Sequence, residues 1–120
     1  FMHAWDEKIA SRTLVTDFRI PETGQMIIVG DLRGQLDDLL TLMVVHGEPS
    51  QTVRYLFTGN LVDKGNHGAE IVCLLFAFFV EDPNCIMFTR GNHEDAELNK
   101  RDASEGGGFF KECVDKYGTA

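Results

Sequence analysis

Three short apolar runs alternate with two longer segments of helical periodicity along most of this chain. The runs at residues 26–29, 55–57 and 86–88 are rich in β-branched and aromatic residues, a pattern typical of buried parallel strands. The segments 36–46 and 69–80 carry apolar residues at helical spacing. This order predicts an α/β fold built on a β-α-β-α-β unit with a parallel sheet.

A polar motif that contains glycine follows each apolar run. Gly-Asp-Leu-Arg-Gly occupies residues 30–34, Gly-Asn-Leu-Val-Asp-Lys-Gly occupies 59–65, and Arg-Gly-Asn-His-Glu occupies 90–94. The carboxyl ends of parallel strands meet at one edge of an open sheet, and ligand sites collect there. We therefore expect Asp31, Asn60 and Asn92 to meet at this edge, as a metal site or the relic of one.

In order and spacing, these motifs resemble the signature blocks GDxHG, GDxVDRG and GNHE of the metal-dependent serine/threonine protein phosphatases, which are calcineurin-like metallophosphoesterases. The resemblance covers roughly residues 24–117 and only the first half of that family's catalytic domain, so it implies one half of the family's two-sheet sandwich. We interpret residues 1–23 as an N-terminal extension and lead-in, and 24–120 as the N-terminal part of a phosphatase-like domain. Segments 30–40 and 91–99 look most like the EF-hand-containing, retinal-degeneration type.

Three chemically active positions depart from the family pattern. Arg33 stands where the first block has His, Asn60 where the second block has Asp, and Lys64 where the second block has Arg. The resemblance implies a first metal held by Asp31 and positions 33 and 60, and a second metal shared by position 60 and Asn92. A neutral amide bridges two cations poorly, and a guanidinium carries only donors. We expect Arg33 to pair with Asp31, and whether Asp31 keeps a ligand role stays open.

The acid pair of the family pattern is retained. The resemblance implies that Asp63 orients His93, the general acid, and that Arg33, Lys64 and Arg90 form an anion-binding edge. The family completes its second metal with two histidines from its later half, and none follows His93 in this chain. A relic histidine hydrogen-bonded to Asp63 is therefore favoured over a working acid.

Two main functions follow from these motifs. The favoured interpretation is a pseudophosphatase that acts in phospho-partner binding or in assembly and needs no cofactor. The alternative is a fragment of an active phosphoprotein phosphatase that hydrolyses phosphoserine or phosphothreonine with two divalent metals (Mn, Fe or Zn). A purely structural subunit is a second alternative. Metal binding and turnover separate the first two.

Composition and topology restrict the partners. The net charge of −8 argues against nucleic acid or an anionic membrane, and the apolar run 71–80 is too short to span a bilayer. Three irregularly spaced cysteines fit a cytoplasmic protein. Helices on one side of the sheet would leave an apolar face exposed, which monomers rarely tolerate. We expect either helices on both faces of the sheet or another surface over the exposed face: a missing segment of a longer parent chain, a second copy, or a different protein. A phosphoprotein is a further candidate partner.

Overall fold

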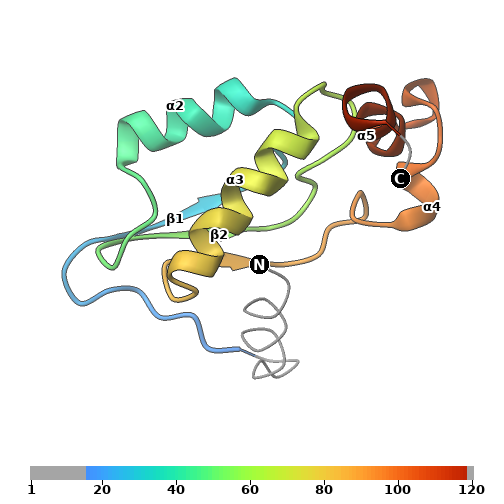
Figure 1. Ribbon diagram of the computed structural model, residues 1–120. Coiled ribbons are helices and arrows are strands. Elements are labelled where there is room, and N and C mark those ends of the chain that lie inside the picture. The colour runs from blue at the N-terminus through green and yellow to red at the C-terminus, as the bar shows by residue number, and fades with distance from the viewer. Residues whose placement is uncertain (1–15, 119–120) are drawn as a thin grey trace.

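The computed structural model describes residues 16–118, which form a three-stranded parallel sheet in the order β1-β2-β3 (Figure 1). The strands are β1 (Gln25–Val29), β2 (Val53–Phe57) and β3 (Ile86–Phe88). The register pairs Val29 with Phe57 and Phe57 with Phe88, so all three strands end side by side. The predicted β-α-β-α-β order is confirmed, with one or two residues added at the start of β1 and β2.

Helices α2 (Leu36–His46) and α3 (Gly68–Glu81) connect the strands and lie together on one face of the sheet (Figure 1). Both connections step across the sheet in the same direction, and right-handed crossovers then place both helices on the same side. The core between them contains fully buried side chains from every layer: Leu39, Tyr55, Phe57, Ile71, Leu75 and Ile86. Each such large apolar side chain contributes roughly 1.5–3 kcal/mol by leaving water.

The other sheet face has no helix among the described residues. Register and strand alternation put Met26, Ile28 and Leu56 on this face, and Ile28 is 67% exposed. The alternative in which helices wrap both faces is therefore wrong for residues 16–118, because α2 and α3 share a side. We call Met26, Ile28 and Leu56 the open face.

A short helix α4 (Ala96–Asn99), a 3-10 turn η1 (Ala103–Glu105) and helix α5 (Phe109–Tyr117) follow the sheet and lie near its carboxyl edge (Figure 1). The carboxylate of Glu112 accepts hydrogen bonds from the backbone N–H groups of Gly68 (3.1 Å) and Ala69 (3.0 Å) at the start of α3. Such contacts satisfy donors that a helix leaves free at its N-terminus. Helix α5 is thereby tied to α3.

The predicted N-terminal extension and lead-in comprises residues 1–23. Residues 1–15 lie outside the described part of the chain, and residues 16–23 form neither helix nor strand. No helix within residues 16–118 combines the length and apolar character needed to cross a membrane. The assignment to the cytoplasm stays a prediction.

Candidate functional site

The first two motif loops are joined by backbone hydrogen bonds at the carboxyl edge of the sheet. The carbonyl of Asn60 accepts from the N–H groups of Leu32 (3.1 Å) and Arg33 (2.9 Å), and the carbonyl of Leu61 accepts from Gly34 (2.8 Å). These bonds fix the position of Arg33 relative to Asn60. The first and second motifs thus form one rigid surface.

Glu94 joins the second motif to the third. Its carboxylate accepts three backbone N–H groups, from Asn60 (2.7 Å), Leu61 (2.8 Å) and Gly91 (2.9 Å). Gly91 and Asn60 lie so close together that a Cβ on Gly91 would clash with Oδ1 of Asn60. Glu94 therefore acts as a clamp between loops that are about thirty residues apart in sequence.

Four non-glycine residues of the first two motifs have a backbone conformation in the left-handed region. Among the described residues, the non-glycine residues with positive φ are Arg33 (47°), Asn60 (55°), Asp63 (68°) and Lys64 (67°). Each such residue costs roughly 1–2 kcal/mol relative to ordinary backbone conformations. The cost is tolerated because the hydrogen bonds around these loops determine their shape, and strain of this kind clusters at functional sites.

Arg33 is paired with Asp31, as the sequence predicts. Nε and Nη2 of the guanidinium lie 2.8 and 2.6 Å from the same oxygen, Oδ2. The guanidinium therefore does not bridge both carboxylate oxygens, and Oδ1 accepts instead from the side-chain amide of Asn60 at 3.2 Å. The hydrogen bonds from Arg33 and then from Asn60 lower the pKa of Asp31 below its ordinary value.

His93 lies between Arg33 and Asp63. Its Nε2 is 3.0 Å from Nη1 of Arg33, and its Nδ1 is 3.0 Å from Oδ2 of Asp63. A guanidinium can only donate, so Nε2 must accept and the ring proton must be on Nδ1, where it is donated to Asp63. With this tautomer, Nε2 has no proton to give to a leaving group.

Asp63 is fully buried and holds the third motif and helix α5 in place. Besides His93, its carboxylate accepts from the side-chain amide of Asn99 (3.1 Å) and from the backbone N–H of Phe109 (2.9 Å). The amide of Asn99 also donates to the carbonyl of His93 at 2.6 Å. A buried carboxylate needs several donors, and this one has three.

The atoms that would bind metal at this edge of the sheet do not fit a pair of divalent metal ions. Both oxygens of Asp31 and Nε2 of His93 accept from neighbouring side chains, and Oδ1 of Asn60 accepts from the backbone N–H of His93 at 3.0 Å. Within residues 16–118, no three His, Cys, Asp or Glu side chains are grouped so that they could hold a metal ion. The positive charge of Arg33 also opposes a cation beside Asp31.

The remaining predicted site residues lie further out. Arg90 donates to the carbonyl of Glu94 (3.0 Å) and pairs with Asp95 (3.4 Å), and it is 71% exposed. Lys64 is exposed and lines a cavity of about 370 Å³ beside α5, together with Lys111 and Lys116. Asn92 is exposed. The structure therefore brings together Asp31, Arg33, Asn60, Asp63 and His93, and its contacts do not tie Lys64, Arg90 or Asn92 to them.

Sequence reasoning missed three groups that build the site: the Glu94 carboxylate, the Asn99 amide and the backbone N–H of Phe109. Glu94 closes the third motif, so its place in the motif was the available signal. Asn99 lies six residues after His93, at a spacing that gives no sign of their contact. A backbone N–H leaves no trace in a sequence.

Comparisons with known proteins identify the family to which this chain belongs. Residues 25–120 match the family described as calcineurin-like phosphoesterase. The chain is 41% identical over 93 residues to the serine/threonine-protein phosphatase rdgC of Drosophila melanogaster. The matched residues cover 78% of this chain and 13% of that protein. It is 40% identical over 100 residues to serine/threonine-protein phosphatase T of Schizosaccharomyces pombe, and this match covers 82% of the chain and 20% of that protein.

A solved structure gives the same result. A serine/threonine phosphatase from Saccharomyces cerevisiae, described as similar to human phosphatase PP5, matches with a TM-score of 0.74 and 33% identity over 82% of this chain and 30% of that chain. The chain thus spans at most a fifth of the two curated relatives and under a third of the solved one. The parallel sheet, the three motif loops and these matches together establish that the chain belongs to the calcineurin-like phosphoesterase family and is related to the serine/threonine protein phosphatases.

Proposed function

We propose that this domain is a pseudophosphatase, which keeps the phosphatase fold but binds phosphorylated partners without hydrolysing them. The observation that carries the proposal is the position of Arg33, whose guanidinium contacts both Asp31 and Nε2 of His93. A permanent cation there takes up the carboxylate that would bind metal and the nitrogen that would deliver a proton. The arginine at position 33 thereby opposes both metal binding and proton delivery.

The same guanidinium is suited to hold an oxyanion. Of its five N–H donors, three are directed at Asp31 and His93, which leaves two for an incoming oxygen. Its side chain is 29% exposed, so a ligand has access to it. Lys64 and Arg90 are exposed near the ends of the other two motif loops and supply further positive charge. We infer weak, metal-independent binding of a phosphoryl group, as expected for charges that stay in contact with solvent.

The alternative is a fragment of an active metal-dependent phosphatase, and one observation favours it. The buried pair of Asp63 and His93 is held together by Asn99, which is the support that a working acid would need. This alternative requires Arg33 to leave His93 and Asp31 when substrate and metal bind. A domain that serves only as a structural subunit would bind neither phosphate nor metal.

Hydrolysis of a small aryl phosphate in the presence of manganese separates the two functions. The proposal predicts a rate equal to that of the buffer, because no activated water and no proton donor are available. Hydrolysis that requires manganese and disappears in the His93→Ala variant would establish the active enzyme instead.

Calorimetry with a phosphopeptide tests the binding half of the proposal. We expect weak binding that is unaffected by a chelator, falls as salt rises, and is reduced by Arg33→His. Lys100→Gln is the matched control, because Lys100 is an exposed cation on the turn after α4 and, within residues 16–118, pairs only with Glu97 at 3.8 Å. If no binding of the phosphopeptide is detected, the structural-subunit function is the one that remains. Binding that a chelator removes would indicate a metal centre.

We also propose that the open face is covered by a second copy of the chain when the domain is isolated. Its exposed Ile28, with Met26 and Leu56 beside it, is an apolar surface that water does not favour. A specific partner in the cell could use the same surface. The oligomeric state of the isolated domain tests this proposal.

A further inference from the structure

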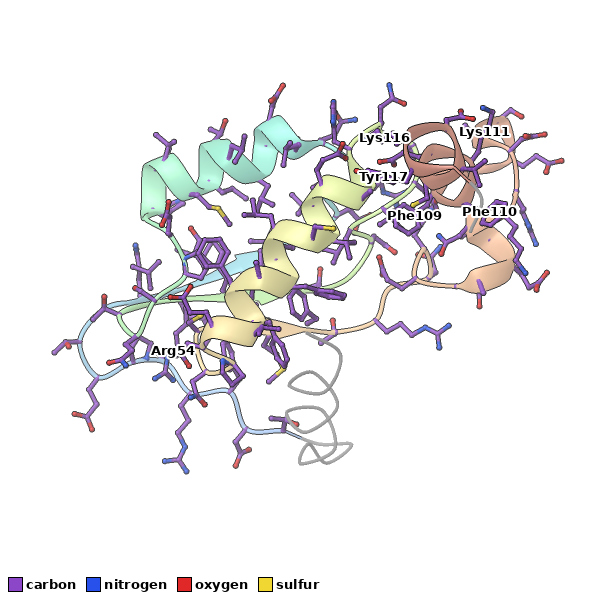
Figure 2. The ribbon with its side chains drawn as sticks, viewed as in Figure 1. Arg54, Phe109, Phe110, Lys111, Lys116 and Tyr117 are labelled. Atoms are coloured by element: carbon purple, nitrogen blue, oxygen red, sulfur yellow. The ribbon has the colours of Figure 1, made fainter. Side chains whose placement is uncertain are left out.

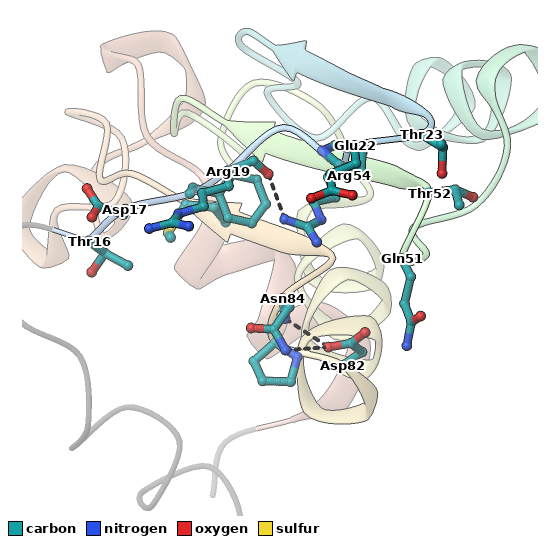
Figure 3. Close-up of a pocket in the computed structure, with 14 residues that line it drawn as sticks. Thr16, Asp17, Arg19, Glu22, Thr23, Gln51, Thr52, Arg54, Asp82 and Asn84 are labelled. Atoms are coloured by element: carbon teal, nitrogen blue, oxygen red, sulfur yellow. Dashed lines mark hydrogen bonds between the residues drawn. The ribbon is translucent and has the colours of Figure 1, made fainter.

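A separate cavity of about 760 Å³ lies at the opposite end of the sheet, where the strands begin (Figure 3). It is lined by residues of segment 16–23, which we call the lead-in segment, by residues that precede β2, by the turn between α3 and β3, and by Arg54 and Met87 on the sheet face away from α2 and α3. Figure 2 places Arg54 far from Lys111 and Lys116 of α5, at the other end of the molecule. The volume lies within the range of small-molecule sites, about 300–1,000 Å³.

Arg54, the second residue of β2, is one of the residues that line this cavity. Arg54 alternates with the buried Tyr55 and pairs in register with Met26, so its side chain leaves the sheet on the side away from α2 and α3. Nη1 donates to the carbonyl of Arg19 at 2.6 Å (Figure 3). Nε is buried and has no hydrogen-bond partner among the described residues. A buried N–H without an acceptor is rare and indicates a missing group.

The cavity also contains charges of both signs that do not pair with one another. Two arginines (Arg19, Arg54) and three carboxylates (Asp17, Glu22, Asp82) line it, and within residues 16–118 none of the five forms an ion pair. The excess of carboxylates disfavours a multivalent anion, yet the Nε–H of Arg54 needs an acceptor. A ligand that carries one oxyanion and one amine meets both conditions.

The rest of the lining adds an apolar component. Phe18, Pro21 and Met87 face the same cavity as the charged groups. Small-molecule sites commonly combine apolar walls with a few polar groups that fix the orientation of the ligand. The combination therefore suits a molecule that has an apolar group beside its two charges.

We propose that this cavity binds a small zwitterion with an apolar side group, such as a free apolar amino acid. Its carboxylate accepts from the Nε–H of Arg54, its amine is held by the carboxylates of the lead-in segment, and its apolar group lies against Phe18 and Met87. The site uses no residue of the motif loops. It is therefore independent of the pseudophosphatase proposal, and each can fail without the other.

Nuclear magnetic resonance of the arginine Nε–H groups tests this directly. L-leucine is titrated into the protein in parallel with N-acetyl-leucine, which lacks the charged amine, and with leucine amide, which lacks the carboxylate. We expect leucine to shift the Arg54 Nε–H resonance downfield, and each analogue to bind roughly tenfold more weakly because one charge-assisted contact is lost. An unchanged Arg54 resonance over the full solubility range of leucine, or equal binding of all three compounds, would overturn the proposal.

Two variants locate the binding. Arg54→Lys keeps the charge but has no Nε–H, and Glu22→Gln removes one carboxylate from the lead-in segment, so both should weaken leucine binding. Arg101→Lys and Glu97→Gln are matched controls, since both positions are exposed and neither lines the cavity. Equal loss in the variants and in the controls would contradict the assignment to this cavity. The analogue series in the unmodified protein decides the outcome where Arg54→Lys does not fold.

Discussion

Nη1 of Arg33 lies 3.0 Å from Nε2 of His93, a contact between residues sixty positions apart. Because the guanidinium cannot accept, this contact sets the histidine tautomer, with the proton on Nδ1 and directed at Asp63. We predict that nitrogen NMR at neutral pH will find Nδ1 of His93 protonated and Nε2 unprotonated. A proton on Nε2 would mean that Arg33 does not donate to it in solution. The variant Arg33→Met, which removes the donor, provides the comparison spectrum.

The Glu94 clamp predicts a stability effect at a site where the sequence suggests only chemistry. Glu94→Gln keeps the shape of the side chain but replaces one acceptor oxygen by a donor that faces backbone N–H groups. We expect a loss of about 2–3 kcal/mol in the free energy of unfolding, measured by denaturant titration. Glu97→Gln, at a carboxylate that is 83% exposed, should change it by less than about 0.5 kcal/mol. Equal effects at the two positions would contradict the clamp.

The sequence predicts the elements of this fold well, and the reasons are local. The bounds of the 36–46 helix and the 86–88 strand agree with the structure, because their apolar residues have a clear period and glycine or polar residues flank them. The Ser-Glu-Gly-Gly-Gly run at residues 104–108 predicts a flexible insertion, yet the turn η1 overlaps the start of this run. The backbone N–H groups of Glu105 and Gly107 donate to the carbonyl of Asp102, and that of Gly106 donates to the carbonyl of Ala103, a local turn that apolar periodicity does not report.

The candidate site also has some contacts that the sequence predicts and others that it does not. The pairing of Asp31 with Arg33 is present, as side-chain chemistry predicts, and the pairing of Asp63 with His93 is present, as the family resemblance implies. The contact of Arg33 with His93 depends on the left-handed backbone of Arg33 and on loops tied together by Asn60 and Leu61. No rule that reads one segment at a time gives such an arrangement.

Burial of Cys85 predicts a pH-dependent reactivity. Burial and then the nearby Asp82 raise the pKa of this thiol to about 11, whereas Cys73 is exposed. Because the thiolate is the reactive form, alkylation of Cys85 by iodoacetamide should be slow at pH 8 and should accelerate only as the pH approaches 11. Mass spectrometry of peptides over time measures both cysteines, with Cys73 as the internal control. Similar rates at pH 8 would mean that Cys85 is accessible in solution.

The open face predicts self-association of the isolated domain. We expect light scattering to detect a dimer, and Ile28→Lys to give a monomer that keeps the same circular dichroism spectrum, because the charge opposes burial of this face. Val44→Lys is the control, at a residue of α2 that is 85% exposed and lies on the helix side of the sheet. A monodisperse monomer that does not bind a hydrophobic dye would exclude association through this face.

The manganese content of the purified protein tests the central claim most directly. After incubation with manganese and removal of the unbound ion, elemental analysis of the unmodified protein should give the level of a buffer blank, because Arg33 and Asn60 engage the atoms that would bind the metals. The double variant Arg33→His/Asn60→Asp should retain more manganese, which shows that the method can detect binding at this edge. Two equivalents of manganese per chain in the unmodified protein would contradict the pseudophosphatase account.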